Sequence, residues 1–252
     1  MTFYELYKAL DAKFPKSLMC EWDNDGIMCA DDLEAPCKKV LISLDVTNEA
    51  VDYAIKNGFD TVISHHPLVF KGQKSLSALN FTQNKLISLV KNGVRVMSFH
   101  TRLDAADGGV NDALLSLLGF DKAENDPLDP IGRICTFEKE ISLDDFASQI
   151  KKTLGSSAIS YVGNRAVKRV YIVGGDGKDL IGNALSCGAD TLLTGNASYN
   201  SMLDADEMGL NVIEAGHFYT ENPVCALLEK YVLALCKDVE IELFNSNKIK
   251  TI

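Results

Sequence analysis

The chain contains four histidines, and each follows closely on a short apolar run that predicts a β-strand. His65 and His66 come directly after DTVIS, and His100 comes directly after VRVMSF. His217 comes just after NVIEA. Open α/β sheets bind their ligands at the carboxyl ends of their strands. The positions of the histidines therefore indicate one shared site.

Two carboxylates accompany these histidines at a fixed spacing. Asp104 lies four residues after His100, and Glu221 lies four residues after His217. In a helix this spacing places both side chains on one face. Three histidines and two carboxylates exceed the three protein ligands that a catalytic zinc usually takes, which favours two ions sharing a bridging carboxylate. The predicted metal ligands are His65, His66, Asp104, His217 and Glu221.

Imidazole nitrogens and carboxylate oxygens suit zinc, iron, manganese, cobalt or nickel, and they do not select among these metals. The expectation is therefore two divalent ions per chain, of unspecified identity. A structural alternative exists for the histidine pair. Neighbouring residues of a strand point to opposite faces, so one of His65 and His66 would be a core residue if the strand continued through them.

His100 has two interpretations. It is either an outer partner that orients Asp104 or a side chain that is simply packed. If it lies at the site, His100 and Glu221 are the candidates for proton transfer during hydrolysis.

Three further segments have structural and functional interpretations. Gly174–Gly177 is either a phosphate cradle at a helix start or, as we favour, a tight turn that needs positive φ. Gly108 and Gly109 either let the backbone approach a metal ligand or form a flexible helix cap. Trp22–Gly26 is interpreted as a turn whose Asp and Asn side chains bond to their own backbone.

Short β-rich runs alternate with helical patterns along most of the chain. Because parallel strands need crossover helices, this rhythm predicts parallel α/β sheets. The expected strands are Lys39–Val46, Asp60–Ser64, Val94–Phe99, Ile131–Phe137, Ala158–Val162, Arg169–Val173, Asp190–Thr194, Asn211–Ala215 and Val239–Phe244. The expected helices are Asn48–Asn57, Leu79–Lys91, Asp107–Leu118, Ser142–Leu154 and roughly Glu221–Lys237. The segment NDPLDP at 125–130 breaks the rhythm and predicts a linker or domain boundary.

Composition excludes several classes of function. The net charge of −10 over 252 residues makes a nucleic-acid partner improbable, since phosphates would be repelled. The first fourteen residues form an amphipathic pattern instead of a signal peptide, and no apolar run approaches the ~20 residues of a membrane helix. Seven cysteines without a C-x-x-C pair argue against a disulfide framework. We therefore expect a soluble, cytoplasmic protein without a membrane partner.

Several strings resemble one family. EWDNDGI, SHHPLVF, HTRLDAADGGVNDALLSLLG, GADTLLTGN and VIEAGHFYTE occur in the order found in the Nif-three-like family (NGG-one-interacting factor three). Many of its members are named GTP cyclohydrolase I type 2 homologues. The resemblance runs from about residue 20 to 225, and the paired histidines followed by proline and the terminal G-H-x-x-x-E are its most specific motifs.

The resemblance implies an α/β fold of two interlinked α/β domains with a two-metal site between them. It places the ligands on the five residues already selected and implies that His100 lies nearby. The expected first domain is 1–125 plus about 218–252, and the second is 126–217, without the inserted domain of longer members. The resemblance also implies a homohexamer, a trimer of dimers.

Three positions depart from the family pattern. Asn196 stands where Asp is frequent, Asn200 where His is frequent, and Arg102 where Asn is frequent. None is a predicted metal ligand. Because neither amide ionises, a proton-transfer role at Asn196 or Asn200 is in doubt.

The leading hypothesis is a metal-dependent hydrolase that resembles GTP cyclohydrolase I type 2 and acts on a nucleotide or a related small molecule. The alternative is a non-enzymatic metal-binding regulator or scaffold protein. A zinc deaminase is excluded because H-x-E and P-C-x-x-C are missing, and a P-loop nucleotidase because its glycine-rich motif is missing.

Overall fold

The computed structural model describes residues 1–120 and 122–250, and it divides into two compact units. Unit 1 comprises Met1–Leu103 and Val224–Asn247, and unit 2 comprises Asp104–Pro223 with the described residues 248–250. Residues 104–125 and 218–223, which were expected in the first domain, group with unit 2. The chain therefore enters unit 2 earlier and leaves it later than the sequence suggested.

Unit 1 is built on one five-stranded sheet. Its strands, in spatial order, are β1 (Gly26–Cys29), β4 (Arg95–Ser98), β3 (Thr61–Ser64), β2 (Lys39–Ser43) and β11 (Glu240–Phe244). All neighbours pair in parallel except β1, which is antiparallel to β4. The predicted parallel α/β arrangement is confirmed here.

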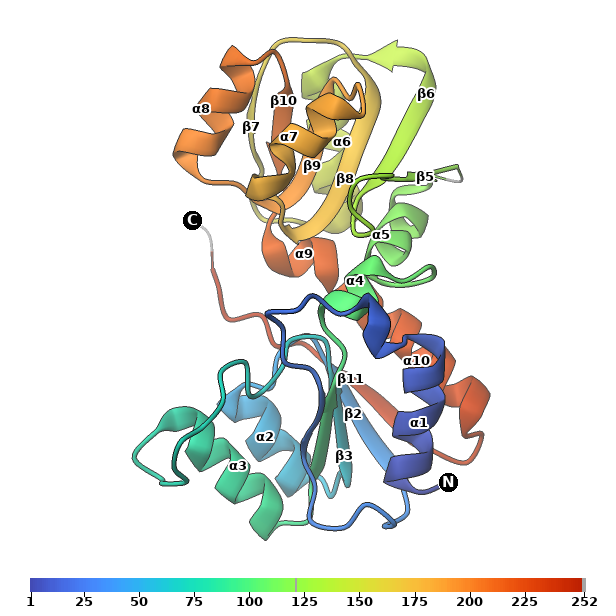
Figure 1. Ribbon diagram of the computed structural model, residues 1–252, viewed down its shortest axis with the longest axis vertical. Coiled ribbons are helices and arrows are strands. Elements are labelled where there is room, and N and C mark those ends of the chain that lie inside the picture. Colours follow the sequence, from blue (N-terminus) through green and yellow to red (C-terminus); the bar gives the residue numbers. More distant parts are fainter. Residues whose placement is uncertain (121, 251–252) are drawn as a thin grey trace. The chain divides into compact units, whose positions relative to one another are not determined.

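Helices cover both faces of this sheet (Figure 1). α1 (Phe3–Lys13) and α10 (Pro223–Leu235) lie on one face, and α2 (Asn48–Lys56) and α3 (Phe81–Lys91) lie on the other. The core under α2 and α3 contains Leu41, Val62 and Val96 from successive strands. A 3₁₀ turn, η1 (Lys16–Leu18), follows α1. Thr2 begins α1 with a capping box in which its hydroxyl and Glu5 bond reciprocally to the backbone.

Unit 2 is built on a six-stranded mixed sheet. Its spatial order is β5 (Glu124–Asn125), β6 (Arg133–Ile141), β8 (Val167–Asp176), β9 (Thr191–Asn196), β10 (Asn211–Glu214) and β7 (Ser160–Val162). The central strands β8, β9 and β10 are parallel, and the outer pairs are antiparallel. Most expected elements are therefore present, with ends shifted by a few residues.

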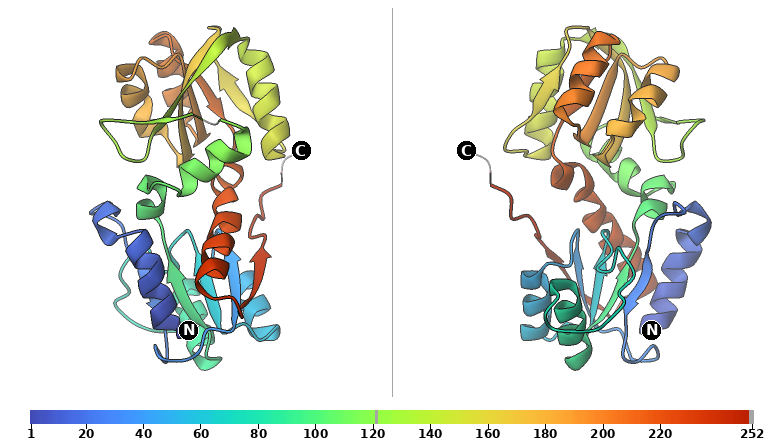
Figure 2. Two further views of the ribbon diagram at one scale, coloured as in Figure 1. Left: turned by 90° about the vertical axis from the view of Figure 1, so that its right-hand side faces the viewer. Right: turned by 60° about the vertical axis from the view of Figure 1, so that its left-hand side comes forward.

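The faces of the second sheet are also covered by helices (Figure 2). α5 (Val110–Leu118) and α6 (Leu143–Leu154) pack on one core, and α7 (Ile181–Ser186) and α8 (Tyr199–Glu207) pack on the other. The remaining elements are α4 (Thr101–Ala105), η2 (Lys178–Leu180) and α9 (His217–Glu221).

The segment 125–130, predicted as a linker, belongs to unit 2. Asp126 is buried there and accepts hydrogen bonds from Tyr171 Oη at 2.6 Å and Asn183 Nδ2 at 3.0 Å. Its two prolines mark a structured loop rather than a flexible connection.

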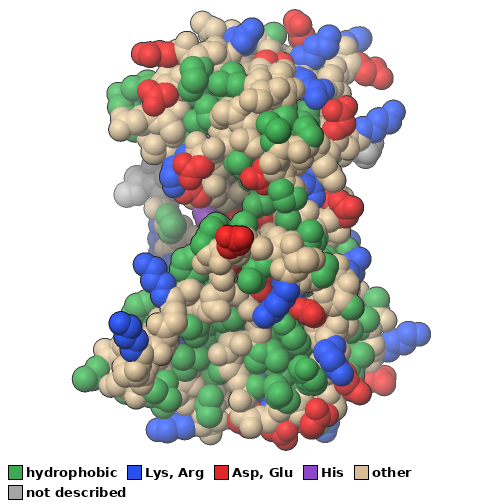
Figure 3. All heavy atoms as spheres, in the orientation of Figure 1, with side chains coloured by type: hydrophobic (Ala, Val, Ile, Leu, Met, Phe, Trp, Pro, Cys, Tyr) green, Lys and Arg blue, Asp and Glu red, His purple; other side chains and the backbone are tan. Residues whose placement is uncertain are grey.

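No helix among the described residues is long and apolar enough to cross a membrane. Lys and Arg side chains are interspersed with Asp and Glu over the face shown in Figure 3. That distribution agrees with the scattered basic residues of the sequence.

Candidate metal centre

Three histidines converge in unit 1. The parallel pairing of β3 with β4 sets Ser64 beside Ser98, so that the residues following the two strands emerge next to each other. One nitrogen from each of His65, His66 and His100 lies within 4.8 Å of the others. The ring centroids of His65 and His66 are 5.0 Å apart, and both rings lie 5.3–5.6 Å from that of His100.

The two paired histidines contribute to the same cluster because β3 ends at Ser64, before them. The alternation of a strand therefore does not apply to the pair, although His65 is fully buried, as the alternative of a core histidine expected, and His66 is half-buried. His100 lies at this cluster as well, and its Nδ1 bonds to Asp23.

Every histidine uses its Nδ1 in a hydrogen bond with a protein oxygen. His65 Nδ1 donates to the Phe99 carbonyl at 2.9 Å. The carboxylates of Asp45 and Asp23 accept from His66 and His100, at 2.7 and 2.8 Å respectively. Since a carbonyl and a carboxylate only accept, Nδ1 carries the proton, and Nε2 is the nitrogen with a lone pair for coordination.

His217 follows the same rule in unit 2. Its Nδ1 lies 2.7 Å from Asn196 Oδ1, and the orientation of that amide is set by Glu214, which accepts from Asn196 Nδ2 at 3.3 Å. Asn196 is therefore the outer partner of His217. Asn200 lies on the exposed start of α8, away from this hydrogen bond.

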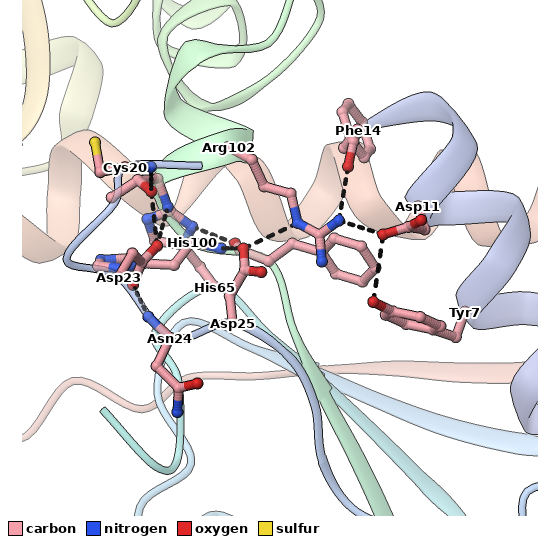
Figure 4. A network of polar contacts seen from close by, with 12 residues as sticks. Tyr7, Asp11, Phe14, Cys20, Asp23, Asn24, Asp25, His65, His100 and Arg102 are labelled. Atoms are coloured by element: carbon pink, nitrogen blue, oxygen red, sulfur yellow. Dashed lines mark hydrogen bonds and ion pairs between the residues drawn. The ribbon is translucent and has the colours of Figure 1, made fainter. Parts of the chain in front are cut away.

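The loop before β1, which contains Asp23 and Asp25, holds His100 in place through hydrogen bonds (Figure 4). Asp23 Oδ1 accepts from His100 Nδ1, and Asp23 Oδ2 accepts from the Thr101 amide at 3.1 Å and hydroxyl at 2.6 Å. Burial alone would raise the pKa of Asp23, but the hydrogen bonds from His100 and Thr101 outweigh burial and lower it. The carboxylate stays ionised and holds the imidazole in one orientation.

Asp25 and Arg102 extend this network. Asp25 Oδ2 accepts from the His100 amide at 3.1 Å and from Arg102 Nε at 2.9 Å. Arg102 Nη1 continues to Asp11 of α1 at 2.5 Å. The interpretation of 22–26 as a self-contained turn was incomplete, since its two aspartates hold the segment that carries His100 and Arg102.

The second group of candidate ligands, one histidine and two carboxylates, lies in unit 2. His217 and Glu221 are the first and last residues of α9, and the spacing of four brings His217 Nε2 to 2.8 Å from Glu221 Oε2. A carboxylate oxygen of Asp104 lies within 4.8 Å of one of Glu221. Two carboxylates this close repel each other, and a cation bound by both would remove the repulsion.

Glycines make room for these ligands. A Cβ on Gly175, whose φ is +66°, would lie 2.0 Å from Glu221 Oε1. A Cβ on Gly195 would lie 2.5 Å from Thr220 Oγ1 and 2.9 Å from His217 Cα. Gly174 and Gly175 of β8 and Gly195 of β9 therefore let α9 approach the two strands closely. The positive φ expected in 174–177 is found at Gly175, which lies within β8 and not in a turn after it.

Asn111 is a further organising residue that sequence reasoning missed. It is fully buried, donates to the Asp104 carbonyl at 3.2 Å and accepts from the Gly174 amide at 2.7 Å. Gly109 precedes it as the cap residue of α5 without a side-chain bond, and Gly108 has φ of +68°. The glycine pair thus starts the helix that ties the Asp104 segment to β8.

A family model, Duf34/NIF3 (NGG1p interacting factor 3), matches residues 1–251. The chain belongs to the NIF3 family. A GTP cyclohydrolase 1 type 2 homolog of Clostridium perfringens is 35% identical over 249 residues, covering 95% of each protein. A homolog with the same name from Clostridium acetobutylicum is 32% identical over 86% of this chain and 84% of that protein.

Solved structures of NIF3-like proteins have the same fold. A hypothetical protein of Staphylococcus aureus is 27% identical, with a TM-score of 0.89, over 100% of this chain and 99% of the other. Reduced HcgD of Methanocaldococcus jannaschii is 28% identical with a TM-score of 0.83, over 96% and 97% of the two chains. The resemblance of the sequence motifs to this family is therefore confirmed.

Proposed function

We propose that this NIF3-family protein is a metal-dependent hydrolase that holds two divalent ions on His65, His66, Asp104, His217 and Glu221. One observation carries the proposal. All four histidines in the chain have Nδ1 fixed by an oxygen acceptor. Ligating histidines almost always have such an outer partner, because it fixes the ring orientation and the tautomer.

Two of the proposed ligands lie close in sequence to the boundaries between the units. The boundary between the units falls between Leu103 and Asp104, and it falls again between Pro223 and Val224. Asp104 is the first residue of unit 2 and comes four residues after His100, and Glu221 is two residues before the second boundary.

When bound, two divalent ions would lower the pKa of a water molecule and polarise the bond under attack. The ions proposed are zinc, iron, manganese, cobalt or nickel. His100 is placed to accept a proton at Nε2, because Asp23 holds Nδ1 protonated. Glu221 is the second candidate for proton transfer.

A nucleotide is the proposed substrate class. Its support is the name GTP cyclohydrolase 1 type 2 homolog carried by relatives that match nearly the whole chain. The corresponding reaction would open the imidazole ring of guanine by hydrolysis and release formate. We also propose that the protein is a homohexamer and that it is cytoplasmic. Light scattering of the purified protein tests the hexamer, and cell fractionation tests the location.

The alternative function is a non-enzymatic metal-binding regulator or scaffold protein. It is supported by the family description as an interacting factor. The two functions differ in coordination, because a catalytic ion keeps an exchangeable position and a structural ion does not. Water exchange measured by relaxation on the manganese-loaded protein separates them.

The first test is metal content by plasma mass spectrometry on untagged protein purified without chelator. About two ions per chain are expected, and a variant carrying His65→Ala and Glu221→Ala should lose them. Asp206→Ala, a change at an exposed carboxylate on α8, is the matched control. Less than half an ion per chain, unchanged in the double variant and after several divalent metals are offered, would contradict the proposal. A nucleotide hydrolysis screen with the metal found then tests the activity.

A further inference from the structure

Unit 1 contains an open pocket of about 530 Å³ with His66 in its wall. Pockets of this size hold small organic molecules. The part of the lining used below consists of Asp45, His66, Phe70, Lys71, Phe81 and Lys85. The pocket thus combines a proposed metal ligand, two cationic side chains and two aromatic rings.

Lys85 is a half-buried residue of α3 that lines this pocket. Its Nζ donates to the Val46 carbonyl at 2.6 Å and lies 5.5 Å from the centre of the Phe81 ring. An ammonium group has three donors, so that the hydrogen bond to Val46 leaves donors for a ligand. Lys71 adds a second positive charge from the exposed loop that follows Phe70.

Asp45 also lines the pocket with a side chain that is 41% exposed, and it contributes a negative charge. Its Oδ1 accepts from His66 Nδ1 at 2.7 Å, and its Oδ2 accepts from Ser246 Oγ at 3.0 Å. Two lysines against this one carboxylate leave the pocket with an excess of one positive charge, in a chain whose net charge is −10. A protein this acidic repels anions in general, so a cationic pocket next to the site is a specific feature.

Two helices begin at the same pocket. Thr47 caps α2 and Asn80 caps α3, and both residues line the pocket. Helix N-termini add positive potential, although these side chains already accept the first amides. The lysines are therefore the direct donors, and the helices reinforce them.

The aromatic residues indicate the other half of a ligand. Phe70 and Phe81 are 45% and 71% exposed, which is unusual for rings that line a pocket. The Phe70 ring lies 6.1 Å from the Trp22 ring and 6.1 Å from the His100 ring, centre to centre. A planar or apolar group that stacks on Phe70 would thus sit next to the histidine cluster.

We infer that this pocket binds the anionic group, a phosphate or a carboxylate, of a small organic substrate through Lys85 and Lys71. The inference rests on the proposed function, because it assigns to the pocket the binding and positioning of the substrate for the proposed hydrolysis. It deepens the proposed substrate class by assigning a place to each part of the molecule: the anionic group lies at the lysines, and a planar or apolar body reaches toward the histidines.

Titration calorimetry on the full-length protein tests the inference, with inorganic pyrophosphate and malonate as separate probes. Tighter binding of pyrophosphate identifies a phosphate subsite, and tighter binding of malonate identifies a carboxylate subsite. Lys85→Gln should weaken the preferred probe roughly 10-fold or more, as expected for the loss of a charged hydrogen bond. Lys71→Gln should weaken it less, because Lys71 is exposed. Lys85→Arg should retain most of the binding, which separates loss of charge from loss of fold.

Lys74→Gln is the matched control, since Lys74 lies on the same exposed loop outside the pocket lining. Repeating the titrations in the variant with His65→Ala and Glu221→Ala separates the pocket from the ions. Binding that persists there and still depends on Lys85 supports the pocket even if the metal proposal fails. Binding that vanishes there, or that Lys85→Gln leaves unchanged, overturns the pocket and leaves the metal proposal standing. Failure of both probes to saturate overturns it as well.

Discussion

The hydrogen bond from His66 to Asp45 gives the sharpest test of the metal centre. Asp45 Oδ1 lies 2.7 Å from His66 Nδ1. Asp45→Asn keeps the shape of the side chain and an oxygen acceptor for His66, but it removes the negative charge. Outer partners of ligating histidines typically contribute 10- to 100-fold to metal affinity. Because each factor of ten equals about 1.4 kcal/mol, metal binding should weaken by roughly 1.4–2.8 kcal/mol.

Competition with a chromophoric chelator measures this loss directly. Glu242→Gln is the matched control, because it makes the same change in an exposed carboxylate of unit 1 whose partner is the Tyr53 hydroxyl. The control should bind metal as the parent does. If Asp45→Asn retains the parent affinity with an unchanged melting temperature, His66 is not a metal ligand.

Three other predictions concern unit 2. Asn196→Asp should tighten metal binding several-fold, since a carboxylate bonded to Nδ1 makes His217 a more basic ligand. The same chelator competition measures this change. An unchanged affinity would mean that His217 does not bind the metal. Gly175→Ala should lower metal affinity at least tenfold, because its methyl group would displace Glu221. An unchanged affinity would contradict the close packing of Glu221 against Gly175. Asp126→Asn should cost about 1–3 kcal/mol in denaturant unfolding at neutral pH. Burial raises the pKa of Asp126, but its hydrogen bonds outweigh burial and lower it below the ordinary 3.8, so the parent should lose this stability as the pH falls below about 4, while the variant should not.

Much of the fold could be predicted from the sequence, because periodic apolar runs specify strands and helices locally. The strand expected at Asp60–Ser64 is β3 (Thr61–Ser64), and the helix expected at Ser142–Leu154 is α6 (Leu143–Leu154). The domain limits were harder, because prolines at 127 and 130 resemble a linker in sequence. In the structure the same loop is held by the buried Asp126, a long-range contact that no local pattern reveals.

Some residues of the candidate site could likewise be recognised from the sequence, and others could not. The histidines could be recognised because their type is rare in this chain and their positions follow strands. Asp23 and Asn111 could not, because their partners lie 77 and 63 residues away in sequence. Their only local signals were the WDNDG and GGVND strings, which are equally typical of ordinary turns.

The order in which the two units occur along the chain has a consequence for synthesis. Unit 2 is one continuous stretch up to Pro223, whereas unit 1 needs α10 and β11 from the stretch Val224–Asn247. On the ribosome, unit 2 can therefore fold before β11 has been synthesised, while the edge of β2 that pairs with β11 is still exposed. Exposed strand edges recruit other strands, so the nascent chain is most prone to misassembly during this interval.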